Sequence, residues 1–396
     1  MTSGFYLNAL GLINSLGAGK DAVAKGLMAG DTGGMGLMDG IAIEGPAFVG
    51  AVKGPLPEID PAFREYDSRN NRLLLAALNE IEPEIRSAID RFGPDRIAVI
   101  LGTSTSGISD NEPGIAVKVA EGDFPDGFDY ARQENGNLSL FVRKYFGLTG
   151  PAMTISTACT SSAKTLSSAR RLIRAGLCDC AIVGGADTLG RLTINGFGSL
   201  DLLSETLCNP FSRNRNGINI GEGAAVFLMS REEGPVRVKG IGESSDAYHM
   251  STPDPEGAGA KAAMAAALED ASLEAADIGY LNLHGTATVL NDSMEGTAVA
   301  SLFPGGVPCS STKPLTGHTL GAAGATELAF LWLALQNNYS NGALPPHIWD
   351  GEVDPDLPPL DLVARGRMRD PAKPAMMSNS FAFGGSNISV ILTEGK

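Results

Sequence analysis

A cysteine in a turn rich in hydroxyl groups is the residue of this sequence best placed for covalent chemistry. Cys159 lies in "STACTSSAK" (156–164), between the run "PAMTISTA" and a predicted helix over 162–176. At such a turn the unpaired amides and positive dipole end of the helix favour a thiolate. This setting predicts a nucleophile, although a free cysteine among small residues is more often a packing residue. The other cysteines lack this setting, and we predict structural roles for Cys178, Cys180, Cys208 and Cys309.

Two of the four histidines lie in turns of small residues that leave room for a ligand. His284 ends a predicted strand in "NLHGTAT", and His318 lies in "STKPLTGHTLGAAGATE". His249 and His347 lie in polar or proline-rich loops instead. A lone histidine beside a strand end is commonly structural, but two in such turns, together with a turn cysteine, favour catalysis.

Carbon–carbon bond formation at a thioester is one chemistry that these residues could carry out. It needs a thiolate that holds one acyl group, donors to a developing enolate and an oxyanion hole. Cys159, His284 and His318 could fill the first two roles, and a backbone amide of "FAFGGSN" (381–387) the third. A Cys-His hydrolase remains an alternative, since it needs one histidine with an orienting Asn or Asp. A metal site is another, but no third ligand is evident from the spacing. The residues alone therefore predict a thiol enzyme.

The elements that must position these residues alternate between short apolar runs and helical patterns. This alternation predicts an α/β architecture whose central strands are buried on both faces. We expect strands at 97–101, 180–183, 280–288 and 387–393, the first two stopped by glycine, and helices at 70–92, 162–176, 259–272 and 322–338. A charged stretch with glycine and proline at 230–240 is the expected joint between two halves.

The composition restricts the partners and the location of the protein. The 396 residues carry a net charge of −15, which disfavours nucleic acid and anionic membrane surfaces as partners. No positive charge precedes Lys20, and the longest apolar run, Leu328 to Leu335, is too short to span a membrane. We therefore expect a cytoplasmic protein. The five cysteines, without a Cys-x-x-Cys pair, predict neither a disulfide framework nor a zinc site.

Five motifs follow one another along the chain: "TACTSS" around Cys159, "GEGAAVFL" (221–228), "HGTATVLNDSMEG" (284–296), "SSTKPLTGHTLGAAGATE" (310–327) and "NSFAFGGSN" (379–387). Together they resemble the motifs of the elongating β-ketoacyl-(acyl carrier protein) synthases, the condensing enzymes of fatty-acid and polyketide synthesis. The resemblance implies the thiolase fold, an α/β fold in which two similar halves pack as a five-layered αβαβα core. We expect residues 1–235 to form the half with the nucleophile and residues 236–396 the half with both histidines.

The resemblance also implies roles for the chemical groups. Cys159 becomes the acyl-accepting nucleophile, and His284 and His318 the pair that binds the extender thioester and promotes its decarboxylation. Lys313 matches the lysine that orients this site, with Glu327 as its partner, unless the two form a solvated ion pair beside a helix. Loss of carbon dioxide from a malonyl group would give an enolate that attacks the acyl thioester, with no metal or organic cofactor.

Further positions match the family's substrate-binding residues. Phe383 matches the gating phenylalanine whose amide completes the oxyanion hole with that of Cys159, and Phe381 lines the same turn. Thr286 and Thr288 match threonines that bind the phosphopantetheine arm. Two acidic positions match a structural pair, Asp292 and Glu295.

The resemblance implies two kinds of partner. One is an acyl carrier protein that delivers acyl and malonyl groups, for which a local basic spot of Arg64, Arg69 and Arg72 is the candidate docking site, unless these are solvated arginines at a helix start. The other is a second ketosynthase-fold subunit, in a homodimer or a heterodimer.

Departures from the family pattern limit what can be carried over. Ala287 stands where the family usually has glycine, and Ser386 where it has threonine. The segment from 102 to 148 resembles housekeeping members least, which leaves the acyl chain open and suggests a specialised polyketide-like or aryl polyene pathway.

Three related proteins are the rival interpretations. A degradative thiolase would need a second cysteine in "SFAFGGSN", and an initiating synthase an asparagine in place of His318. A chain-length factor, which is a non-catalytic partner subunit, typically lacks the active cysteine that is present here as Cys159.

Overall fold

A twelve-stranded mixed sheet forms the framework of the protein. The computed structural model describes residues 4–395. Eleven of the strands follow the order β13-β12-β11-β14-β15-β10-β1-β9-β7-β5-β6, and β2 pairs with β1. In that order they are β13 (Asp361–Leu362), β12 (Pro308–Ser310), β11 (Ile278–Asn282), β14 (Ala375–Ala382), β15 (Ser386–Glu394), β10 (Val236–Ser245), β1 (Phe5–Asn14), β9 (Gly223–Ser230), β7 (Cys180–Asp187), β5 (Ile97–Gly102) and β6 (Ala152–Ile155), with β2 at Gly17–Ala18.

The pairing pattern of the sheet occurs twice. From β1 outward through β9, β7, β5 and β6, the successive pairs are antiparallel, antiparallel, parallel and parallel. From β10 outward through β15, β14, β11 and β12, the same sequence of pairings recurs. A short antiparallel pairing of β1 with β10 joins the two sets. The repetition supports two similar halves; the predicted boundary at residues 235 and 236 falls between β9 and β10 and stays a prediction.

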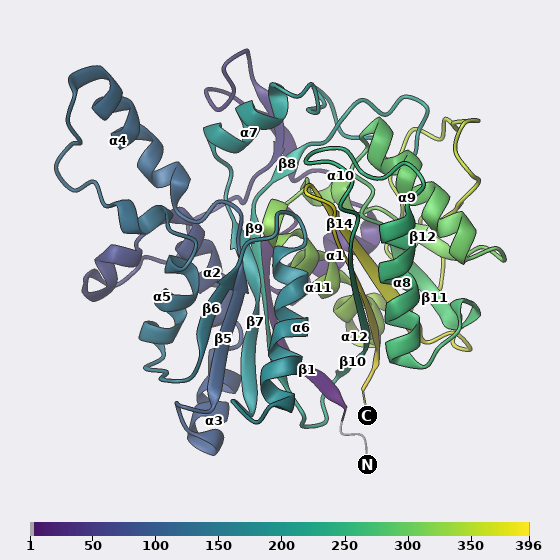
Figure 1. The fold of residues 1–396 in the computed structure, drawn as a ribbon, viewed down its shortest axis with the longest axis horizontal. Helices are drawn as coiled ribbons and strands as arrows, with labels where there is room; N and C mark the ends of the chain where they lie inside the picture. Colours follow the sequence, from purple (N-terminus) through teal and green to yellow (C-terminus); the bar gives the residue numbers. More distant parts are fainter. Residues whose placement is uncertain (1–3, 396) are drawn as a thin grey trace.

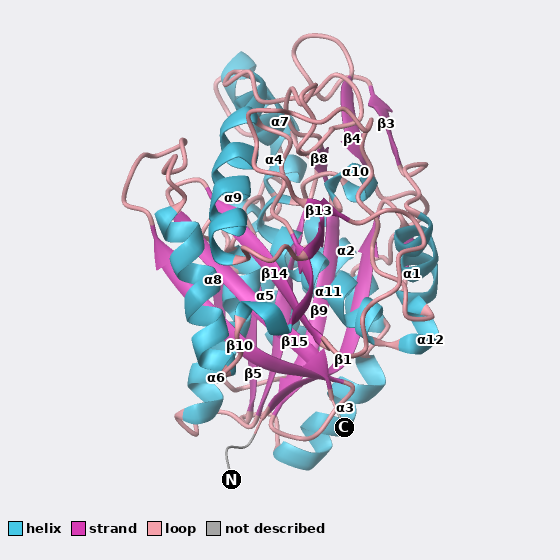
Figure 2. Ribbon diagram, turned by 90° about the vertical axis from the view of Figure 1, so that its right-hand side faces the viewer, coloured by secondary structure: helices cyan, strands magenta, loops and turns pink. Residues whose placement is uncertain are grey.

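Helices cover the outer face of each set of strands, and a further helical layer lies between the two sets (Figures 1 and 2). One outer layer, α2 (Arg69–Asn79), α3 (Glu82–Phe92) and α5 (Asn137–Tyr145), packs on the first set of strands. The central layer contains α6 (Ser161–Arg174) and α11 (Ala323–Leu335), which contact strands of both sets. The other outer layer contains α8 (Ala258–Ala271) and α9 (Val289–Leu302). The result is the predicted five-layered αβαβα arrangement.

The central helix α11 is almost entirely apolar because it is enclosed. All of its residues are buried, and Ala325 and Leu328 to Leu335 form one hydrophobic cluster with side chains of α6 and of both sets of strands. Glu327 is its one charged residue. A helix enclosed on every side needs no polar face. Separate clusters lie under the two outer layers. No helix within residues 4–395 has the length and apolar character needed to cross a membrane.

Smaller elements surround the carboxyl ends of the parallel strands. A second sheet has the order β3-β4-β8, and α4 extends away from the body of the molecule (Figure 1). The remaining elements are α1 (Lys20–Ala29), β3 (Met35–Met38), β4 (Ala47–Gly50), α4 (Ile108–Glu121), α7 (Arg191–Gly198), β8 (Ile220–Gly221), α10 (Lys313–Thr316) and α12 (Asn337–Ser340), with short 3₁₀ turns at Pro61–Tyr66, Tyr130–Gln133, Ala275–Asp277 and Leu320–Ala322.

Four predicted elements differ in extent from the structure. The strand expected at 280–288 is β11, which ends at Asn282, and the helix expected at 322–338 ends at Leu335 as α11. The helix expected at 70–92 is divided into α2 and α3, because Pro83 lacks an N–H and fits the first turn of a new helix. The strand expected to stop at Val183 continues through Gly184 and Gly185 to Asp187. A Cβ at Gly184 would lie 2.1 Å from the carbonyl oxygen of Ala225 on β9. These glycines therefore allow close strand packing and do not end the strand.

Candidate active site

The turn that carries Cys159 connects β6 to α6 and has an unusual backbone. Ala158, directly before the cysteine, has a φ of +50°, in the left-handed region that alanine seldom occupies. Ser161 fixes the turn, because its Oγ accepts a hydrogen bond from the Thr157 amide at 2.9 Å and donates one to the Ala158 carbonyl at 2.5 Å. The neighbouring hydroxyl groups thus build the turn, which holds Cys159 buried at the start of α6.

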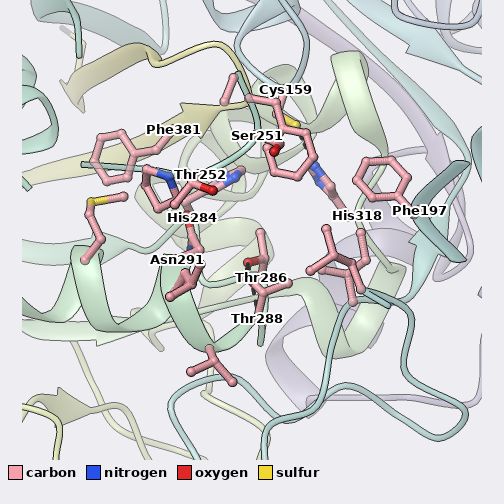
Figure 3. Close-up of a pocket in the computed structure, with 18 of the residues that line it drawn as sticks. Cys159, Phe197, Ser251, Thr252, His284, Thr286, Thr288, Asn291, His318 and Phe381 are labelled. Carbon is pink, nitrogen blue, oxygen red and sulfur yellow. Dashed lines mark hydrogen bonds between the residues drawn. The ribbon is translucent and has the colours of Figure 1, made fainter. Parts of the chain in front are cut away.

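The structure brings Cys159, His284 and His318 together. The Sγ of Cys159 lies 2.9 Å from Nε2 of His318. The two imidazole rings are 5.4 Å apart and nearly perpendicular. All three side chains reach the same cavity (Figure 3). His284 follows β11 and His318 follows β12 and α10, so the carboxyl ends of neighbouring parallel strands place both histidines.

Burial keeps all three groups uncharged at rest. It raises the pKa of the Cys159 thiol to about 12, against a smaller opposing effect of the charge on Lys313. Burial, followed by the Lys313 charge, holds the pKa values of His284 and His318 well below their ordinary value. The helix start was expected to favour a thiolate, but the loss of solvent outweighs it. Cys159 is therefore a thiol whose proton must leave when sulfur attacks, and the adjacent Nε2 of His318 can accept it in one tautomer.

Lys313 and Glu327 form a buried ion pair behind the histidines. The Nζ of Lys313 lies 2.6 Å from Oε1 of Glu327 and also donates a hydrogen bond to the backbone carbonyl of His284. Their side chains are only 2% and 4% exposed, so solvent hardly screens the pair. Lys313 thus fixes the backbone of His284, and Glu327 compensates the positive charge of Lys313.

Two buried carboxyl groups hold the turn 284–288. Glu295 accepts hydrogen bonds from the amides of His284 and Gly285 at 2.8 and 2.7 Å. Asp292 accepts one from the amide of Ala287 at 3.1 Å. Burial raises the pKa of Glu295 to about 7 and that of Asp292 to about 6. Ala287 has a φ of +64°, which explains why glycine suits this position and shows that the turn tolerates alanine.

A cavity of about 200 Å³ leads to the three reactive groups. Thr286 and Thr288 line it, with their hydroxyl oxygens 3.0 Å apart. Phe381 lies beside His284, with ring centres 6.2 Å apart, and is buried. Phe383 is partly exposed and packs on another lining residue, Phe197 of α7. Except for Lys313 and Glu327, which lie behind the histidines, the predicted substrate-binding and catalytic side chains therefore share one cavity.

The three arginines of the predicted docking spot differ in their surroundings. Arg69 makes two hydrogen bonds to the buried carboxylate of Glu222, and Arg72 makes two to Asp67. Arg64 is exposed and has no ion pair within residues 4–395. Both ion-paired arginines serve the local structure, and the docking role of all three stays a prediction.

Asp187 is a site residue that was not predicted. It ends β7 in "GGADT" and accepts hydrogen bonds from the hydroxyl groups of Thr103 and Thr105 at 2.6 and 2.7 Å. It also accepts one from the Ala322 amide at 3.0 Å, four residues after His318. Asp187 thus connects the loop after β5 to the loop of His318. A polar residue at a strand end after two glycines was the available signal.

The remaining histidines and cysteines lie outside the cavity lining. His347, expected in a loop, is buried; its Nδ1 accepts a hydrogen bond from the Ser311 amide and its Nε2 lies 3.0 Å from the Pro210 carbonyl. His249 accepts backbone hydrogen bonds in an exposed turn. The other cysteines are buried and free: Cys178, Cys180, Cys208 and Cys309.

Comparisons with known proteins agree with this geometry. Residues 54–234 match the N-terminal domain of β-ketoacyl synthases, and residues 236–348 match the C-terminal domain. The chain is 30% identical to a 3-oxoacyl-[acyl-carrier-protein] synthase 2 of Vibrio cholerae, over 97% of both chains.

Solved structures show the same fold. A chain from the complex of a ketosynthase with its chain length factor, from Xenorhabdus doucetiae, is 47% identical, with a TM-score of 0.93 over 99% of this chain and 98% of that one. A β-ketoacyl synthase from Burkholderia phymatum is 25% identical, with a TM-score of 0.88 over the full length of both chains. The predicted thiolase fold is confirmed, and the chain belongs to the β-ketoacyl synthase family of condensing enzymes.

Proposed function

We propose that this protein is an elongating β-ketoacyl-(acyl carrier protein) synthase. It joins an acyl group held on Cys159 to a malonyl group on the carrier protein, with loss of carbon dioxide, and gives a 3-oxoacyl product. The observation that carries the proposal is the contact of Cys159 Sγ with His318 Nε2, beside His284 in a cavity lined by Thr286 and Thr288.

In the first half-reaction, Cys159 takes the acyl group from the carrier protein. Its sulfur attacks the thioester carbonyl, its proton passes to Nε2 of His318, and the carrier thiol leaves with a proton. The amides of Cys159 and Phe383 are the proposed donors to the oxyanion of the tetrahedral intermediate. An uncharged imidazole 2.9 Å from sulfur has the position that this proton transfer needs.

In the second half-reaction, the malonyl group loses carbon dioxide and leaves an enolate. Each neutral imidazole has one N–H, so His284 and His318 can donate hydrogen bonds to the enolate oxygen. The enolate carbon then attacks the acyl carbonyl on Cys159, the bond to sulfur breaks, and the Cys159 thiolate takes up a proton from solvent to restore the resting thiol. Lys313 supports this step from behind, because it fixes the carbonyl of His284.

The alternatives within the fold fit the site less well. A non-catalytic chain-length-factor subunit would not need a thiol in contact with a histidine at the end of a cavity. A degradative thiolase would need a second cysteine near the turn 383–385, and the four other cysteines lie elsewhere.

The proposed partners follow from the same relatives. A ketosynthase of Xenorhabdus doucetiae forms a complex with a chain length factor, and another solved ketosynthase binds a type II polyketide acyl-carrier protein. We assign this chain the catalytic position in a comparable heterodimer, with the exposed Arg64 as the carrier-docking candidate. A specialised polyketide-like pathway, including an aryl polyene one, is the proposed setting.

Mass spectrometry after incubation with acyl-carrier protein tests the nucleophile. The unmodified protein should gain one acyl group, Cys159→Ala none, and the control Cys180→Ala should react normally because Cys180 lies at the opposite end of β7 from the site. An adduct that persists in Cys159→Ala, or none on the unmodified protein, would refute the proposal. His318→Ala should block release of carbon dioxide from malonyl-carrier protein.

A further inference from the structure

The three reactive groups also have the composition of a metal site. A third ligand was not evident from the sequence, because Cys159 lies far from both histidines along the chain. In the structure one ligand atom from each of Cys159, His284 and His318 lies within 4.8 Å of the others, and all three residues are buried. Thiolate sulfur and imidazole nitrogen are the ligands that zinc prefers.

We propose that Cys159, His284 and His318 form an inhibitory binding site for a soft divalent cation such as Zn²⁺, open in the free protein and closed once Cys159 carries an acyl group. The inhibition rests on the proposed function, whereas the binding of the metal does not.

The geometry needs only small adjustments. Zinc lies about 2.3 Å from sulfur and about 2.0 to 2.1 Å from nitrogen, so tetrahedral ligands are separated by roughly 3.3 to 3.7 Å. The present separations, from 2.9 Å between Cys159 and His318 to at most 4.8 Å, enclose this range. The ligand atoms would have to move by up to about 1 Å, which side-chain rotation can supply.

Three protein ligands leave one coordination position free. The cavity of about 200 Å³ adjoins all three residues, so a water molecule can complete the tetrahedron from that side. The same cavity is the route by which the ion reaches the site. The site therefore has the form of an open zinc centre, and any ion in it blocks the position of the substrate carbonyl.

The charged groups around the site nearly balance one another, so they neither strongly repel nor strongly attract a cation. When Zn²⁺ binds, the Cys159 thiol loses its proton to the buffer, one Zn–S and two Zn–N bonds form, and coordinated water leaves the ion. The positive charge of Lys313 repels the cation, but Glu327 lies 2.6 Å from Lys313 and compensates that charge.

The surroundings of the histidines limit the affinity. Nδ1 of both His284 and His318 is buried without a hydrogen-bond partner among the described residues. In dedicated zinc sites this nitrogen usually donates a hydrogen bond to an acceptor, and loss of that acceptor lowers the affinity for zinc about 10- to 100-fold. We therefore expect reversible binding, weaker than that of a structural zinc site by about this factor.

Acylation should abolish the site. A thioester sulfur carries no negative charge and is a poor metal ligand, and the acyl chain occupies the open coordination position. Free enzyme is thus sensitive to zinc, whereas the acyl-enzyme continues to the condensation step.

Metal binding is tested directly with Co²⁺ and Zn²⁺ on the full chain, reduced with a phosphine because dithiols bind zinc. The unmodified protein should show a thiolate-to-Co²⁺ charge-transfer band and bind one equivalent of Zn²⁺ in competition with a chromogenic chelator. Cys159→Ser, His318→Asn and protein alkylated with iodoacetamide should lose both signals. The control Cys180→Ala should keep them.

An unchanged Co²⁺ band in Cys159→Ser, or no band in the unmodified protein, would overturn the inference. Alkylated unmodified protein needs no substitution, so a folding defect in a variant does not affect the conclusion. If zinc binds at Cys159 but no acyl group is ever transferred, the proposed function fails while the site stands. If acyl transfer is normal and zinc does not bind, only the inference fails.

Discussion

Replacing Lys313 by methionine should destabilise the protein by an amount that depends on pH. The substitution keeps the length of the side chain but removes the charge partner of Glu327, which is 2.6 Å away and 4% exposed. Removal of one member of a buried ion pair typically costs about 3 to 5 kcal/mol, because the other charge stays uncompensated.

The sign of the pH dependence follows from Glu327. Burial already raises its pKa in the native protein, and Lys313 counteracts this effect. Without Lys313 the folded-state pKa rises further above the unfolded value. Below the pKa that Glu327 has in the unfolded protein, its carboxyl group is protonated in both states and the variant keeps its stability. As pH rises through the higher pKa of Glu327 in the folded protein, this stability is lost.

Urea unfolding of both proteins at about pH 5.5 and about pH 8 measures the effect. The loss should be larger at the higher pH, and Lys313→Met/Glu327→Gln should recover most of it because no unpaired charge remains. Equal losses at both pH values, or a double variant no more stable than the single one, would refute the reasoning. Both variants should lose activity, since the carbonyl of His284 loses its anchor.

Three other outcomes follow from the structure. Asp187→Asn should lower the free energy of unfolding by about 2 to 3 kcal/mol and slow acylation of Cys159, since charged acceptors contribute about 1.5 to 3 kcal/mol per hydrogen bond. Unfolding curves measure the first effect and the rate of adduct formation the second. An unaltered acylation rate would argue against a positioning role for Asp187. The rate of Cys159 alkylation by iodoacetamide should keep rising with pH above pH 8.5, because burial raises the pKa of the thiol; a plateau below neutral pH would contradict this. Arg69→Ala should lower the free energy of unfolding by about 1 to 2 kcal/mol. This value is smaller than for a fully buried ion pair, because Arg69 is 40% exposed although Glu222 is buried. Weaker carrier binding at unchanged stability would instead support a docking role for Arg69.

The reactive groups could be predicted from the sequence because each lies in a local pattern. Cys159 precedes a helix after an apolar run, and His284 and His318 lie in small-residue turns after strands. Their contact could not be predicted from spacing alone, since it depends on three loops that meet at the carboxyl ends of β6, β11 and β12. The resemblance to condensing enzymes supplied that link.

The supporting residues were harder to predict for a physical reason. Asp187 acts through hydrogen bonds to two loops that are distant in sequence, and no local pattern records such partners. The state of Cys159 depends on how completely solvent is excluded, which the turn sequence does not determine. Gly184 ends an apolar run in the sequence, but the close approach of β9 decides that the strand continues.

The pairing of Phe5–Leu7 in β1 with Val236–Val238 in β10 has a consequence for how the protein unfolds. These residues join the two repeated sets of strands, and α11, which follows β10 in the chain, packs against β9 and α6 of the first set. Neither repeat can complete its interior alone, so both should melt in a single cooperative transition. A protease cut between β9 and β10 should leave two fragments that stay associated and keep the active site assembled.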